Sequence, residues 1–166
     1  MTARGLSLYS DLEKMTDAMP AVAFVPVHRA GILVDLGRAR EALPVVDAAL
    51  KRADGGELPA GVSRNLRQQA LRVRVAAEAT SAADAAAKTA MDLQQQANER
   101  KDDVNAQSAM HYGLGMAAIA KRDYAVAKGH FEQCLTFDAE CRRQIAAAAQ
   151  KAGDKDSAEA ARPAVI

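Results

Sequence analysis

The sequence predicts an all-α fold, in which about eight or nine helices pair as antiparallel helical hairpins and stack as a short right-handed α-solenoid. Only 4% of the 166 residues are aromatic, Trp is absent and alanine is abundant. This composition suits close contact between helices and suits sheets poorly, because strands favour β-branched and aromatic side chains. Apolar residues also recur at helical spacing, and four similar turns separate the helical segments.

Composition and charge exclude several classes of protein. The chain has 22 Lys and Arg against 21 Asp and Glu, a net charge of +1, so no overall field favours nucleic acid or an acidic membrane. It contains no apolar run long enough to predict a membrane span. We predict a single domain over residues 1–166 with no nucleic-acid partner.

The first elements follow from proline and glycine positions. A short helix is predicted at about residues 6–18, followed by a hairpin at about 26–53. Pro26 suits the first turn of a helix, and Gly37 is a good stop between the two helices of this hairpin. Pro44 is expected to bend the second helix or to delay its start.

A Gly- and Pro-rich loop over residues 54–61 precedes the remaining hairpins. These are predicted at about residues 62–99, 102–137 and 138–161. Side chains that accept hydrogen bonds from free backbone N–H groups favour the helix starts. The expected N-caps are Ser63, Asp102 or Asp103, Asp123 and Asp138. The helix that starts at Asp138 is expected to end at Gly153. The second helix of the 102–137 hairpin is expected to end near Phe137.

The four turns form an internal repeat. Each has a turn residue and, five positions later, a small residue where the returning helix would touch its partner. The pairs are Gly37 with Ala42, Thr80 with Ala85, Arg122 with Ala127, and Gly153 with Ala158. The intervals between the turn residues are 43, 42 and 31 residues, which indicates lengthened helices or loops in the first two repeats.

Residues 111–135 carry the clearest pattern. Small residues at Gly115 and Ala127 would let two antiparallel helices approach closely, while Leu114, Tyr124 and Phe131 fill the seam around them. This segment resembles a tetratricopeptide repeat, and the resemblance extends over about residues 26–161, most strongly over 109–158. It implies a tetratricopeptide-like solenoid whose first helices line a concave face.

The resemblance also implies a non-catalytic scaffold or adaptor that binds a protein or peptide on that face. The partner-binding candidates are Arg29, Arg72, Asn105, Tyr112 and Arg142. We expect His111 to face inward and Tyr112 outward, as an exposed aromatic that grips a peptide. The alternative is a sensor or regulatory fragment of a larger protein that binds a small molecule or a partner domain. The exposed ends of a solenoid would also allow a homodimer.

No enzyme class is predicted. The sequence lacks G-x-S-x-G, H-E-x-x-H, a Gly-rich phosphate loop and paired C-x-x-C motifs, so we expect no catalytic residues and no cofactor.

The two cysteines leave three interpretations open. Cys134 and Cys141 would lie close enough for a disulfide in a tight connection between hairpins. They would equally suit reduced, buried thiols. A metal site would use these two cysteines and His130 as ligands, and His111 is the one evident fourth ligand. This ligand pattern is weak, so no metal is predicted.

The position of the cysteines carries a second resemblance. The chain is similar to bacterial secreted or periplasmic repeat proteins of unassigned function, in which one cysteine ends a hairpin and another opens the next. This implies a periplasmic or secreted location, with a signal peptide removed or outside this sequence. A cytoplasmic location is the alternative.

Overall fold

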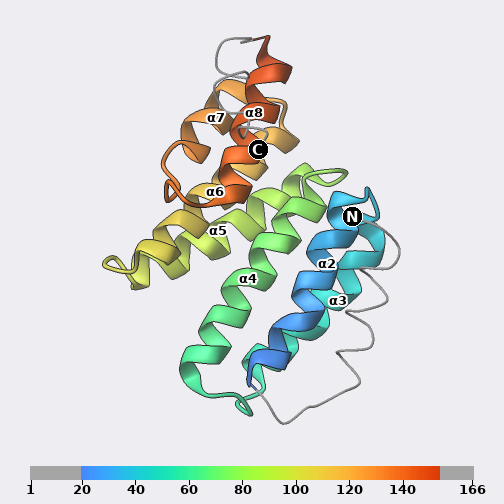
Figure 1. The fold of residues 1–166 in the computed structure, drawn as a ribbon, viewed down its shortest axis with the longest axis vertical. Helices are drawn as coiled ribbons and strands as arrows, with labels where there is room; N and C mark the ends of the chain where they lie inside the picture. The colour runs from blue at the N-terminus through green and yellow to red at the C-terminus, as the bar shows by residue number, and fades with distance from the viewer. Residues whose placement is uncertain (1–19, 154–166) are drawn as a thin grey trace, which may run out of the picture. The chain divides into compact units, whose positions relative to one another are not determined.

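The computed structural model describes residues 20–153, and every regular element in that range is a helix (Figure 1). The elements are the 3-10 helix η1 (Pro20–Phe24) and the α-helices α2 (Val25–Asp35), α3 (Ala39–Asp54), α4 (Ala60–Glu78), α5 (Ala83–Glu99), α6 (Val104–Ala120), α7 (Tyr124–Phe131) and α8 (Ala139–Ala152). The all-α prediction is therefore confirmed for this range. The helix expected at 6–18, and the last helix expected after Gly153, lie outside the described residues, so the helix count stays a prediction.

The chain divides into two compact units, one up to Ala77 and one from Glu78 onward. The single domain over residues 1–166 and the right-handed solenoid stay predictions. No helix among the described residues combines the length and the apolar character that crossing a membrane would require.

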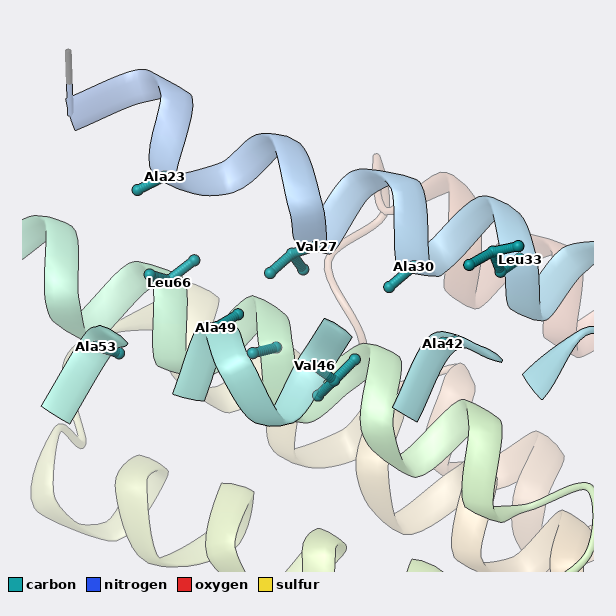
Figure 2. Packing of buried hydrophobic residues seen from close by; sticks show 10 residues of the cluster. Ala23, Val27, Ala30, Leu33, Ala42, Val46, Ala49, Ala53 and Leu66 are labelled. Atoms are coloured by element: carbon teal, nitrogen blue, oxygen red, sulfur yellow. The ribbon is translucent and has the colours of Figure 1, made fainter. Parts of the chain in front are cut away.

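The core of the first unit is built from rows of small and branched residues. In Figure 2, Val27, Ala30 and Leu33 lie along one side of α2. A matching row on α3 comprises Ala42, Val46, Ala49 and Ala53. Ala23 of η1 and two residues of α4, Leu66 and Ala70, complete the cluster. The steps of three and four residues in these rows place each set on one face of its helix. Ala30 in the α2 row and three of the four residues in the α3 row are alanines, which leave room for the helices to pack closely.

The boundaries of α2 and α3 agree with the predicted hairpin at 26–53. Pro26 lies in the first turn of α2, where its missing N–H costs no hydrogen bond. Gly37 follows the end of α2 with φ +74°, a left-handed conformation that costs glycine little. Pro44 does not delay the start of α3, because the helix already begins at Ala39 and contains Pro44. The alternative, that Pro44 bends this helix, stays a prediction.

Helix α4 also begins earlier than predicted, at Ala60 rather than near Ser63. Ser63 is therefore not an N-cap, and its hydroxyl donates to the backbone oxygen of Leu58 at 3.4 Å. Two ion pairs connect α4 to α3, one between Arg67 and Asp54 and one between Arg74 and Asp47.

In the second unit, α6 is the central helix. It packs against both α5 and α7, and α7 packs against α8 (Figure 1). Two glycines make these contacts close. A Cβ on Gly113 would lie 2.7 Å from Cδ1 of Leu93 on α5, and a Cβ on Gly115 would lie 2.7 Å from Cζ of Phe131 on α7. The predicted close approach at Gly115 is confirmed.

Three of the four predicted turns share one backbone motif. Gly37, Arg122 and Gly153 all have positive φ just after a helix. After the first two, the next backbone N–H donates to the carbonyl five residues earlier, which satisfies the helix end. These bonds are Arg38 to Leu33 at 2.8 Å and Asp123 to Ala118 at 2.9 Å. The turn at Thr80 is different, since Ala82 donates to Glu78 there.

Helix α7 is shorter than predicted. It ends at Phe131, whereas the sequence predicted an end near Phe137. The backbone tightens after Phe131, because the N–H groups of Gln133 and Cys134 bond three residues back instead of four. The next N–H, that of Leu135, leaves the helix and donates to the Ser108 hydroxyl of α6. This tertiary bond competes with a further helical turn.

Candidate functional site

A disulfide links Cys134 after α7 to Cys141 in the first turn of α8, with their Cα atoms 6.3 Å apart. Both residues are buried. The bond closes a short loop over residues 134–141, which we call the disulfide loop.

Ser108 of α6 forms hydrogen bonds with two residues of this loop. Its side chain is 3% exposed, and its Oγ accepts a hydrogen bond from the N–H of Leu135 at 3.1 Å. The same hydroxyl donates to Oδ2 of Asp138 at 3.4 Å. Asp138 in turn caps α8, because its Oδ1 accepts from the N–H groups of Glu140 and Cys141. The loop is therefore held at both ends by hydrogen bonds as well as by the disulfide.

Phe137 lies in the disulfide loop and is 74% exposed, the largest exposure among the large apolar side chains that the structure describes. Three other exposed residues of this kind also belong to the second unit: Met91, Val104 and Val126. Single exposed apolar residues are ordinary on protein surfaces. Phe137 differs because its backbone is part of a cross-linked and hydrogen-bonded loop.

The predicted partner-binding residues do not form one set. Arg29 and Arg72 are half-buried in the first unit, on α2 and α4. Asn105 and Arg142 are exposed in the second unit, near the starts of α6 and α8. Their roles in binding stay predictions.

The predicted exposure of Tyr112 was wrong, since this side chain is only 3% exposed. Its ring packs against Phe131 with ring centroids 6.1 Å apart, and its hydroxyl donates to Oε1 of Glu140 at 3.4 Å. Tyr112 can be buried because its hydroxyl has a hydrogen-bond partner on α8, and a buried tyrosine hydroxyl needs such a partner.

Two histidines meet between α6 and α7. The Nδ1 atoms of His111 and His130 are 3.4 Å apart, and both side chains are half-buried. Burial, and to a smaller extent the charge of His130, lower the pKa of His111, so the neutral imidazole is favoured there. The pair can share a hydrogen bond when one Nδ1 carries a proton and the other does not.

The cysteine-based metal hypothesis finds no support in this geometry. Both sulfurs are used in the disulfide, and zinc requires thiolates. Between residues 20 and 153, no cluster of three or more His, Cys, Asp or Glu side chains is placed to hold a metal ion.

Sequence reasoning missed Ser108 and Phe137. Phe137 was placed at the end of a helix, and Ser108 in mid-helix carries no local signal, because its partners lie about 30 residues away. The aspartate after Phe137 was a usable signal, since an N-cap at Asp138 requires that the chain before it is not helical.

No protein-family model, curated protein or solved structure matches this chain. The resemblance to tetratricopeptide repeats accordingly depends on the residues described above and stays a prediction.

Proposed function

We propose that this chain is a non-catalytic module that binds a protein or peptide partner through the end of the second unit that carries the disulfide loop. The observation that supports this most is the exposed ring of Phe137 on a loop whose ends are fixed. A partner that covers this ring removes a large apolar surface from water.

The fixed loop makes such an interaction efficient. Binding costs free energy when flexible loops become ordered, and a loop that is already ordered avoids most of that cost. Rigid aromatic anchors surrounded by polar residues are typical of energetically important interface positions.

Exposed polar residues are available on the helices that flank the disulfide loop. Ser108 and Tyr112 of α6 contact the start of α8 at Asp138 and Glu140. Asn105 lies one turn before Ser108, and Arg142 one turn after Asp138, so both exposed side chains belong to the same end of the unit. They are suited to the polar rim of the interface.

The disulfide also supports a periplasmic or secreted location, because disulfides persist in oxidising compartments and are rare where thiols are kept reduced.

A photo-crosslinking amino acid at position 137 tests the proposed function in a lysate of the cells that make the protein. Position 101 is the control, because Lys101 is also exposed in a turn of the second unit. We expect a discrete crosslinked product from position 137, reduced by an excess of purified unmodified chain and not by the Phe137→Ser variant. Equal crosslinking from positions 137 and 101, or equal competition by Phe137→Ser, would contradict the proposal.

A further inference from the structure

We propose that His111 and His130 form a two-histidine binding site for a divalent transition-metal ion such as Zn²⁺, Ni²⁺ or Cu²⁺. The site lies in the second unit, between α6 and α7, and is separate from the partner-binding surface proposed above.

The separation of the two nitrogens carries this proposal. Zinc binds imidazole nitrogen at about 2.0–2.1 Å, so two nitrogens that share one tetrahedral ion lie about 3.3–3.4 Å apart. The Nδ1 atoms of His111 and His130 are 3.4 Å apart, which matches this separation. An ion at this distance from both atoms would lie about 1.1–1.2 Å to one side of the line that joins them, so each ring would have to turn its Nδ1 lone pair away from the other nitrogen and toward that point.

The two ligands are held by different helices. His111 lies on α6, one turn before Gly115, and His130 lies on α7, next to Phe131. The close packing of Gly115 against Phe131 fixes the spacing of these helices at this level. An ion between the histidines would therefore cross-link a hairpin that is already in the correct geometry, with little loss of conformational entropy.

An ion can reach this site. Both histidines are only half-buried. Gly129, the neighbour of His130, is exposed, and a Cβ added there would meet no atom within 4 Å. The described residues offer no third ligand of the His, Cys, Asp or Glu type, so water molecules or a small external ligand would complete the coordination.

The donor set selects the class of metal. Imidazole suits Zn²⁺, Ni²⁺ and Cu²⁺, whereas Mg²⁺ and Ca²⁺ prefer oxygen ligands. The cysteines contribute nothing while they are paired, so the test has to be made without thiol reductants, which would also chelate the metal.

The proposal is tested by titrating the ¹⁵N-labelled, non-reduced chain with zinc chloride and following the imidazole nitrogens by NMR. We expect the Nδ1 signals of His111 and His130 to shift together. His28 on α2 is the matched control, since it is an exposed histidine of the first unit and its signals should not follow the same titration. This measurement uses the unmodified chain and does not depend on any variant folding.

Variants give a second, independent test by calorimetry with zinc chloride. Loss of an outer-shell partner typically lowers metal affinity about 10- to 100-fold, so loss of a ligand in H111Q or H130Q should lower it at least about tenfold. H28Q should bind zinc as the unmodified chain does. The proposal is overturned if zinc leaves both Nδ1 signals unchanged, if it shifts His28 equally, or if folded H111Q and H130Q retain full affinity.

Discussion

Replacing Gly115 by alanine probes the close contact between α6 and α7 on which the second unit depends. Gly115 is a buried residue in the interior of α6. The ring of Phe131, which is 1% exposed, occupies the space that a side chain at position 115 would need. A Cβ at this position would lie 2.7 Å from Cζ and 2.8 Å from Cδ1 of that ring, and closer still to Cε1. A rigid ring cannot yield by rotating one terminal group, so the ring or the helix has to move.

Two opposing effects set the size of the change. Alanine in place of glycine inside a helix stabilises the fold by about 0.5–1 kcal/mol. Inserting a methyl group into a filled core costs about 1–3 kcal/mol. We expect the overpacking to dominate, so G115A should lower the free energy of unfolding by about 1 kcal/mol, which corresponds to roughly 2–4 °C in Tm for a chain of this size.

The assay is urea unfolding followed by far-UV circular dichroism, with two control variants. Gly129 is exposed on α7 and a Cβ there would meet no atom within 4 Å, so G129A should stabilise the chain by about 0.5–1 kcal/mol. At Gly113 the close atom is the terminal Cδ1 of Leu93, and the other contacts begin at 3.5 Å. G113A should fall between the other two variants, because Leu93 can change rotamer.

The reasoning is refuted if G115A stabilises the chain as much as G129A does. A double-mutant cycle gives the sharper comparison. In the background of Phe131→Leu, which removes the ring, the destabilising effect of G115A should shrink or change sign. An unchanged penalty would show that the ring of Phe131 is not its cause.

Three further predictions concern the second unit. Without reductant, neither cysteine of the denatured chain should react with an alkylating agent in an intact-mass measurement; reduction should then cost about 2.5 kcal/mol of stability, as expected for a closed loop of about eight residues. Immediate alkylation of both thiols would contradict the pairing. S108A should lower the free energy of unfolding by about 1–3 kcal/mol, because the half-buried N–H of Leu135 and the cap of α8 lose their partner, whereas the exposed control S81A should change it little. Finally, burial and then the charge of His130 lower the pKa of His111, so the folded chain binds fewer protons there than the unfolded chain. With a chelator present, the contribution of His111 to the free energy of unfolding should be complete above the unfolded pKa of about 6.5 and should decrease as the pH drops below it. A series of urea titrations at different pH values measures this, and H111Q should weaken the pH dependence.

Local signals were enough to predict most of the helix boundaries. Gly37 ends the first helix of its hairpin because a left-handed residue is needed there, and Asp123 and Asp138 cap α7 and α8 through side-chain oxygens that accept nearby N–H groups. These interactions span only a few residues, so the local sequence is enough to predict them. The same holds for Arg122, which the turn pattern aligned with Gly37 although it is not a glycine.

The candidate site was less predictable because its contacts are distant in the sequence. Tyr112 was expected at the surface, and it is buried because Phe131 and Glu140 lie against it. The end of α7 was placed too late, because the hydrogen bond from Leu135 to Ser108 spans 27 residues. Helical periodicity describes one face of one helix and does not say which other helix will cover it.

The sequence by itself determined that the described chain is helical, where most of its helices begin and end, and that Gly115 needs a close neighbour. Only the tertiary structure decided that Gly113 faces α5 while Gly115 faces α7, that Tyr112 is buried and Phe137 exposed, and that two histidines 19 residues apart meet. The physical reason is the range of the interactions. Caps and turns are closed by neighbouring residues, whereas burial depends on which surfaces remain after every helix of a unit has packed.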